Sequence, residues 1–311
     1  MSAPTTTRPE IGAAAKPPRS TRRQRSLHAR GSARWVLGSP LVLFLALLVA
    51  YPIGNGVISS LQNHTLLNPN PTWTGFSNYV QVLTDSNFWS ALSFTVAYTV
   101  LVTSIELVLG FLLALMFERP FPGRRFLLSA LILPIMIAPA LMGIMFRLLL
   151  SQNIGVIPAL FQALGINVSL LSASTVIPLL VVLDVVQWTS FTFLLFHAAL
   201  QGVPAELEEA AQLDRASRPR FVFSILIPLL APTIFITGFL RAIDAFRVFD
   251  TINVLTAGGP GTTTTTLSIY VYKILSSGNF GLASAASVVI AIIVLPIIPF
   301  VIRRITDGAT S

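Results

Sequence analysis

The sequence predicts an all-α protein that crosses a membrane six times. Hydrophobic residues make up 54% of its 311 residues and charged residues only 10%, whereas roughly 25% of the residues of a soluble domain are charged. The mean hydropathy of +0.78 indicates lipid rather than water as the main solvent. A spanning helix needs about 20 mostly apolar residues, and in hydrocarbon a helix satisfies its backbone polar groups internally. Six segments qualify: residues 35–59, 89–117, 126–150, 176–200, 225–246 and 280–302.

Prolines interrupt some of these segments. Pro134 and Pro139 lie inside the third segment. A membrane helix tolerates proline when neighbouring groups satisfy the freed backbone atoms. A kink in the third span is the expected consequence.

The distribution of Lys and Arg predicts that both termini are cytoplasmic. Basic residues gather in the N-terminal tail, in two loops and at the C-terminal end, whereas the loops 60–88 and 151–175 have none. Cytoplasmic loops hold the excess of Lys and Arg. We therefore expect a disordered basic cytoplasmic tail over residues 1–34, a six-helix domain over residues 35–305 with a cytoplasmic loop at 201–224, and a short cytoplasmic tail over residues 306–311.

Charge and residue types exclude several classes of function. Residues 1–34 hold eight of the 20 Lys and Arg, so the net charge of +8 belongs mainly to the tail and does not indicate a nucleic-acid-binding surface. The chain has no cysteine, which excludes disulfides, thiolate zinc sites and thiol nucleophiles. Its three histidines are scattered, and no HExxH pattern is present. We therefore predict no catalytic residue and no metal ligand.

Acidic residues are concentrated in one predicted cytoplasmic loop. Glu206, Glu208, Glu209 and Asp214 belong to a chain with only 12 Asp and Glu. Pro204 suits the first position of a helix, and acids in the first turns oppose the helix dipole favourably. One face of this helix is mostly small and apolar, with acids around it, and it holds Leu207, Ala210, Ala211 and Asp214. The pattern alone leaves two interpretations open, a helix that a partner approaches closely and a solvated helix that packs on its own bundle. Pro219 then ends this helix, and a second one leads into the fifth span.

This stretch resembles the EAA loop of binding-protein-dependent ABC transporter permeases. The matching residues are Glu209-Ala210-Ala211, Asp214, Ala216-Ser217, Phe221, Ile225 and Pro228. In that family the loop is a coupling helix seated in a groove of the cytoplasmic ATPase. The resemblance implies that these residues contact the ATPase: Glu208, Glu209, Ala210, Ala211, Asp214 and Arg215. Arg215 stands where the family usually has Gly, which readily takes a positive φ, and Ile227 where it usually has Leu, so the geometry of the turn is left open.

Further stretches resemble the carbohydrate-uptake branch of this family, the permeases of the maltose, trehalose and glycerol-phosphate type. They are residues 76–96, 199–211 and 245–273. The resemblance implies a type I ABC importer permease fold in a bacterial plasma (inner) membrane, and a non-catalytic subunit without a cofactor of its own. It also implies several partners: a second permease subunit in a heterodimer, two ATPase subunits or domains that hold ATP and Mg, an extracellular or periplasmic sugar-binding protein, and a sugar substrate.

Ionisable residues occur inside the predicted spans. Such groups are costly in lipid and mark either a pathway or an ion pair. Arg241 with Asp244, and Asp244 with Arg247, have the i,i+3 spacing of a pair on a helix. Glu106 fits either a structural hydrogen-bonding role or a proton relay. The full set is Glu106, Arg147, Asp184, Arg241, Asp244 and Arg247.

The predicted substrate pathway combines residues of the fourth and fifth spans. A sugar needs polar groups for its hydroxyls and an aromatic face for its C–H surface. The fourth span offers Asp184, Gln187, Trp188, Thr189 and Phe193. The fifth span and its exit offer Asp244, Arg247, Asp250 and Asn253. The resemblance implies that both groups border the cavity, although Gln187 and Trp188 face differently, so not all of these residues can line it. For each residue, packing between helices is the alternative role.

An ATP-driven sugar importer is the leading hypothesis. Closure of the ATPase pair would move the loop 206–220 as a lever and switch the cavity from outward-facing to inward-facing. Two alternatives stay open, a self-contained secondary transporter that uses Glu106 or Asp184 for proton coupling, and an ABC permease for a non-sugar solute. The sequence does not identify the sugar.

Overall fold

A computed structural model describes residues 25–166, 169–296 and 299 of the chain. The chain divides into two compact units, Met1–Asn55 and Gly56–Ser311. The first unit contains most of the long helix α1 (Arg25–Ser60), whose segment Gly38–Ser60 is long and apolar enough to cross a membrane. Because α1 begins at Arg25, residues 25–34 are helical, whereas the sequence predicted a disordered tail there. Residues 1–24 of that tail lie outside the described part of the chain.

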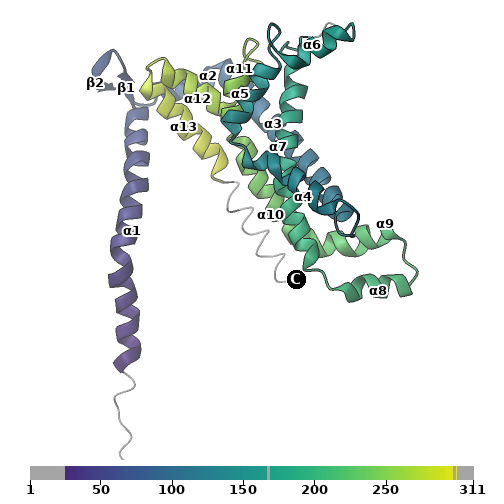
Figure 1. Ribbon diagram of the computed structural model, residues 1–311. Helices are drawn as coiled ribbons and strands as arrows, with labels where there is room; N and C mark the ends of the chain where they lie inside the picture. Colours follow the sequence, from purple (N-terminus) through teal and green to yellow (C-terminus); the bar gives the residue numbers. More distant parts are fainter. Residues whose placement is uncertain (1–24, 167–168, 297–298, 300–311) are drawn as a thin grey trace, which may run out of the picture. The chain divides into compact units, whose positions relative to one another are not determined.

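Long helices form the centre of the second unit (Figure 1). They are α3 (Ser86–Met116), α7 (Val176–Gln201) and an unbroken run of α9 (Arg218–Phe221), the π-helical turn η3 (Val222–Leu226) and α10 (Ile227–Phe246). With α1, the described residues contain 4 helices long and apolar enough to span a membrane. The fifth predicted span begins earlier than expected, because Pro219 lies in the first turn of α9, where proline needs no backbone hydrogen bond.

The third predicted span is bent sharply. It consists of α4 (Arg124–Ile132), the 3-10 turn η2 (Leu133–Met136) and α5 (Pro139–Leu149), with an angle of 97° at the break. Pro134 lies in the first turn of η2 and Pro139 in the first turn of α5. Ala138 has extended backbone angles, as the residue before a proline prefers. The predicted kink is confirmed, and the pair counts as a fifth span if it crosses as one unit.

The sixth predicted span is only partly described. Its helix α13 (Phe280–Val294) is apolar but has 15 residues, fewer than the about 20 that cross a bilayer. Most of the remaining residues of the predicted segment lie outside the described part of the chain. Six crossings therefore stay a prediction.

The segment before α3 contains strands that the all-α prediction missed. β1 (Gln62–Thr65) and β2 (Asn68–Trp73) form an antiparallel hairpin in which Gln62 lies opposite Trp73. Asn78 of α2 (Ser77–Thr84) ties the hairpin down, because its amide donates to the carbonyl oxygens of Ser60 and Gln62, at 2.9 Å each. The local sequence has little apolar periodicity, so these strands depend on tertiary hydrogen bonds that sequence patterning does not reveal.

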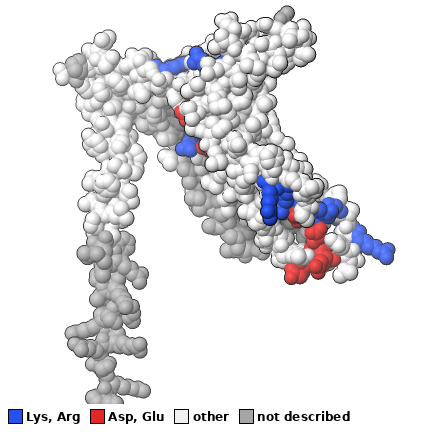
Figure 2. All heavy atoms as spheres, viewed as in Figure 1, with Lys and Arg blue, Asp and Glu red and all other residues white. Residues whose placement is uncertain are grey.

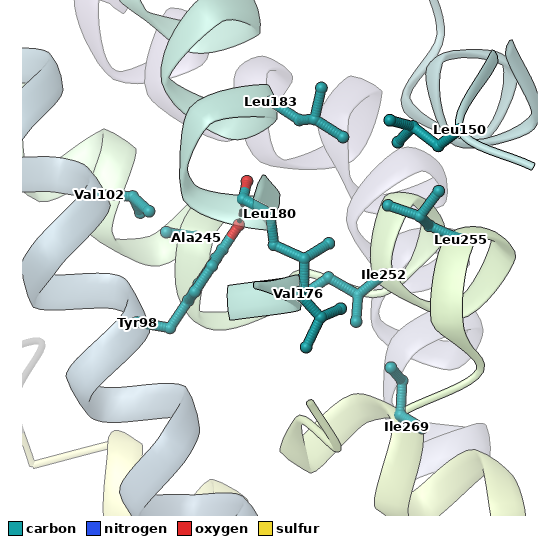
Figure 3. Packing of buried hydrophobic residues seen from close by; sticks show 10 residues of the cluster. All are labelled: Tyr98, Val102, Leu150, Val176, Leu180, Leu183, Ala245, Ile252, Leu255 and Ile269. Atoms are coloured by element: carbon teal, nitrogen blue, oxygen red, sulfur yellow. Dashed lines mark hydrogen bonds between the residues drawn. The ribbon is translucent and has the colours of Figure 1, made fainter. Parts of the chain in front are cut away.

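The helices of the second unit pack around buried apolar clusters. One cluster joins Tyr98 of α3 and Leu180 of α7 to Ile252 of α11 (Asp250–Thr256) and Ile269 of α12 (Leu267–Ser276) (Figure 3). Elsewhere along the same pair of helices, Gly110 permits the close approach of α3 and α7, since a Cβ at this position would lie 2.2 Å from Thr192 Oγ1. This packing brings the middle of α3, α7 and α10 together, which is where the buried charges lie.

Candidate functional site

The acidic loop forms helix α8 (Ala205–Leu213), which Figure 1 shows beyond the end of α7. The helix begins at Ala205, so Pro204 is the residue before its first turn rather than the first helical residue. Glu206 and Glu208 lie in the first turn. Their charge is favourable beside the partial positive charge of the helix N-terminus.

The structure divides the predicted small-residue face of α8 into two. Ala211 is 6% exposed, and Ala211 and Leu207 pack into a cluster with Phe117 and Phe221. Ala210 points away from this cluster and is exposed. It shares the exposed surface of α8 with Glu206, Glu209, Leu213 and Asp214. One side of α8 therefore packs on its own bundle, as the second interpretation expects, and the other side is exposed. Contact of the exposed side with a partner stays a prediction. Figure 2 shows the acidic side chains gathered at this end of the molecule, beside basic ones.

The turn after α8 has the geometry that the usual glycine would provide. Arg215 has φ +54°, a left-handed conformation that costs an L-residue about 1–2 kcal/mol. Its backbone N–H donates to Gln212 O at 3.0 Å, and the N–H of Ala216 donates to Ala211 O at 2.9 Å. These two bonds are those of a Schellman motif. Arg215 thus preserves the turn that the sequence left open.

A cavity of about 310 Å³ lies between α7, α10 and α11. Five of the predicted pathway residues line it, and they are Asp184, Trp188, Asp244, Arg247 and Asp250. Arg241 lines it as well. Its guanidinium carbon lies 4.9 Å from the centre of the Trp188 ring, a distance at which a cation is attracted to the ring face.

Arg241 is the centre of a buried ion-pair network. Its Nε lies 2.5 Å from Glu106 Oε2, and its Nη2 lies 2.9 Å from Glu106 Oε1. Nη2 also donates to Asp184 Oδ2 at 2.6 Å. Glu106 is fully buried, and the side chain of Arg241 is 1% exposed. Glu106 lies on α3, Asp184 on α7 and Arg241 on α10, so the network joins these three helices. Loss of one partner would leave a buried charge uncompensated.

The network extends toward the mouth of the cavity. Arg241 Nη1 lies 3.5 Å from Asp244 Oδ2, and Arg247 Nη2 lies 2.8 Å from Asp244 Oδ1. Both predicted i,i+3 pairs are therefore present. The side chain of Arg247 is 75% exposed and that of Asp244 is 25% exposed, so this end of the network is open to a solute.

The other four predicted pathway residues do not line the cavity. Gln187 is buried and donates to Ile137 O at 2.8 Å. Thr189 is buried as well, and Asn253 is half-buried on α11. Phe193 stacks on His197 in the cluster next to α8. Consecutive helical residues point in different directions, which explains why Trp188 reaches the cavity whereas its neighbours do not.

Sequence reasoning placed Arg241 and Glu106 among the buried charges but left both out of the pathway. The available signal was an arginine and a glutamate within apolar spans, where an unpaired charge is costly. Sequence spacing identified only the helical neighbour Asp244 as a partner of Arg241. Within the described parts of the chain, no cluster of three or more His, Cys, Asp or Glu that could hold a metal ion is present.

Residues 106–310 match the family of binding-protein-dependent transport system inner membrane components. The chain belongs to this family. A probable ABC transporter permease of Sinorhizobium fredii is 34% identical over 275 residues, which cover 87% of this chain and 89% of that protein. The trehalose/maltose transport system permease of Thermococcus litoralis is 32% identical over 258 residues, which cover 82% of this chain and 88% of that protein.

The fold is that of a solved importer. A chain of a bacterial alginate ABC transporter, in complex with an alginate pentasaccharide-bound periplasmic protein, is similar to the permease with a TM-score of 0.77 and 22% sequence identity. The similarity covers 90% of the permease and 96% of that chain. The predicted resemblance to carbohydrate-uptake ABC permeases is confirmed by the relatives, and the permease is a multi-pass membrane component of a transport system.

Proposed function

We propose that the permease supplies one half of the pathway of an ATP-driven importer of neutral sugars. The cavity between α7 and α10 offers the two features that a sugar requires. Trp188 presents an aromatic surface to ring C–H groups, and the carboxylates of Asp244 and Asp250 accept hydrogen bonds from hydroxyls. The cavity has a volume of about 310 Å³, and we expect the second permease subunit to add the remaining wall of the site.

The charges around the cavity are the main observation that supports a neutral solute. Three carboxylates and two guanidiniums line the cavity, so the formal net charge is −1. Both arginines already donate to carboxylates, Arg241 to Glu106 and Asp184, and Arg247 to Asp244. A phosphate or a uronate would therefore meet excess negative charge and committed donors, whereas hydroxyls need no countercharge.

The exposed side of α8 supports coupling to ATPase partners. Leu213 is 86% exposed and lies on the same surface as Glu206, Glu209 and Asp214. An apolar side chain surrounded by acids fits a groove with an apolar floor and a basic rim. In the proposed assembly, two ATPase subunits or domains hold ATP and Mg, a second permease subunit forms a heterodimer in a type I fold, and a sugar-binding protein delivers the substrate. Both termini lie in the cytoplasm.

The buried carboxylates favour a structural role over proton coupling. Glu106 and Asp184 both accept hydrogen bonds from Arg241, and both are almost completely buried. A proton relay needs a carboxyl group that exchanges its proton with water during the cycle. This arrangement supports an importer driven by partner ATPases rather than a secondary transporter.

Uptake by cells with and without the gene tests the proposal. Radiolabelled trehalose, maltose, sorbitol and glycerol 3-phosphate are compared, and we expect gene-dependent uptake of a neutral sugar that persists when an uncoupler collapses the proton gradient and ATP is maintained. Uptake of glycerol 3-phosphate alone would contradict the neutral-solute assignment. Uptake by the purified chain alone, driven by a proton gradient, would contradict the ATP-driven mechanism. Co-purification of an ATPase with the tagged permease in detergent supplies an independent check.

A further inference from the structure

Arg218 joins three segments at the α8 end of the molecule. Its Nη1 donates to Glu208 Oε1 on α8 at 2.5 Å, and its Nη2 donates to Glu118 Oε2 just after α3. The guanidinium carbon also lies 5.9 Å from the centre of the buried Phe221 ring. One planar guanidinium thus holds two carboxylates from different segments, which a lysine ammonium does less well because it lacks the fixed fork of donors.

In the described part of the chain, the other contacts of α8 with the bundle are a narrow apolar seam and a 3.7 Å ion pair between Glu208 and the largely exposed Arg119. Leu207 and Ala211 face the bundle, and Ala211 has a small side chain that buries little surface. Short connections flank the helix, residues 202–204 before it and 214–217 after it. An element with few buried contacts is free to shift at low energetic cost. The bond from Glu208 to Arg218 is therefore important for fixing the position of α8.

The two segments that Arg218 joins to α8 lead to the cavity. Arg218 is the first residue of the helical run that continues through α10 to Arg241. Glu118 follows α3, the helix on which Glu106 lies. Arg241 and Glu106 form the buried pair at the cavity. The same two segments are thus connected by an ion pair at the cavity and by another at the α8 end.

We propose that Arg218 is a positioning residue that makes α8 move together with α3 and α10, so that displacement of α8 by the ATPase reaches the cavity. This inference rests on the proposed coupling function and adds Arg218, which is not one of the matching positions of the EAA loop. Partly exposed ion pairs add little to stability, and the side chains of Arg218, Glu208 and Glu118 are 35%, 35% and 27% exposed. Removal of Arg218 is therefore expected to loosen coupling without unfolding the permease.

Arg220 provides a matched control. It lies on α9, as does Arg218, and it is exposed. Within the described part of the chain, the salt bridges at this end join Glu118 and Glu208 to Arg218 and Arg119, and none involves Arg220. Replacement of either arginine by alanine removes the same charge from α9, but only Arg218→Ala removes the bonds to Glu208 and Glu118.

The first experiment measures solute imported per ATP hydrolysed. The whole complex, with its partner permease, ATPases and binding protein, is reconstituted in proteoliposomes with radiolabelled trehalose or maltose. We expect Arg218→Ala to lower the ratio by about two- to thirtyfold, the range in which single residues change coupling between sites. Arg218→Lys should give an intermediate ratio and Arg220→Ala the wild-type ratio. An unchanged ratio in Arg218→Ala, or an equal loss in Arg220→Ala, would overturn the proposal.

The second experiment does not require transport. The chain has no cysteine, so spin labels can be placed at Gln212→Cys on α8 and Pro120→Cys after α3, both exposed positions. In the assembled complex, we expect a narrow distance distribution with Arg218 and a broader one with Arg218→Ala. Distance distributions of equal width would refute the positioning role of Arg218, even if neither sugar is imported. Failure of the wild-type complex to import either sugar would count only against the proposed substrate.

Discussion

Glu106 on α3 and Arg241 on α10 form a buried bidentate ion pair across 135 positions of sequence. The two contacts measure 2.5 Å and 2.9 Å, and neither side chain is more than 1% exposed. Arg241 also donates to Asp184 and lies against the Trp188 ring, so the same guanidinium stabilises the helix bundle and orients residues of the cavity.

Glu106→Gln should destabilise the permease strongly. The substitution preserves shape but leaves the Arg241 charge with one carboxylate fewer, and removal of one partner of a buried pair costs about 3–5 kcal/mol. Thermal unfolding of the purified complex in detergent measures the effect. Asp250→Asn is the control, because an exposed substitution changes stability by only about 0.5 kcal/mol. Equal unfolding midpoints for the two variants would show that the pair is not a structural element.

Trp188→Ala should weaken transport without loss of assembly. The ring lines the cavity, and complete burial of an apolar side chain contributes about 1.5–3 kcal/mol. A sugar covers only part of the ring, so we expect KM for the imported sugar to rise by up to about thirtyfold, with normal amounts of complex in the membrane. Trp188→Phe retains an aromatic face and should lie in between. Unchanged uptake by Trp188→Ala would remove this residue from the pathway.

Glu209→Lys should abolish import and uncouple ATP hydrolysis while the permease still folds. Glu209 is exposed on α8 beyond its first turn, and an exposed substitution changes stability by only about 0.5 kcal/mol. The charge is expected to meet a basic groove of the ATPase, so its reversal repels the partner. Glu209→Gln separates charge from shape and should retain partial import. Normal transport by Glu209→Lys would contradict the coupling role of α8.

Arg215→Gly should stabilise the permease by about 1 kcal/mol, because glycine takes a positive φ without steric cost. Ala257→Gly is a parallel case, since Ala257 has φ +51°. Arg220→Gly in the right-handed helix α9 should instead destabilise by about 1 kcal/mol. The unfolding midpoints of the three variants test this expectation. If Arg215→Gly lowered the midpoint as much as Arg220→Gly does, relief of backbone strain at Arg215 would be contradicted.

Tyr270 makes stability depend on alkaline pH. Burial, and then the hydrogen bond of its hydroxyl to Asp85 Oδ2 at 2.8 Å, raise the pKa of Tyr270 above the ordinary value of 10.0. Above pH 10.0 the unfolded chain loses this proton while the folded chain keeps it, so stability falls by at most about 1.4 kcal/mol per pH unit. Tyr270→Phe should be less stable than wild type at neutral pH, and the gap should narrow above pH 10.0. A gap that stays constant with pH would contradict the raised pKa.

The sequence by itself determined that lipid is the main solvent, where most of the long helices lie, and that the acidic loop contains the helix α8. Low charge and long apolar runs force a helical solution in lipid, and the acids of α8 mark a short helix through local rules. The end of that helix was predicted wrongly, because α8 ends at Leu213 before the Arg215 turn, and Pro219 lies in the first turn of α9. The i,i+3 pairs at Asp244 were also predictable, because helical geometry places such neighbours side by side. Each of these features depends on residues close in sequence.

Tertiary structure alone decided which partners meet across the bundle. Arg241 is paired with Glu106 and Asp184 because α3, α7 and α10 pack against one another, with Gly110 permitting α3 to approach α7 at Thr192, and no local spacing encodes that packing. The same packing excludes Gln187 and Phe193 from the cavity, turns Ala211 inward while Ala210 stays exposed, and brings Arg218 to Glu118. Contacts between distant residues depend on how each helix is rotated about its axis and how closely it packs against its neighbours. Many side chains determine these two quantities together.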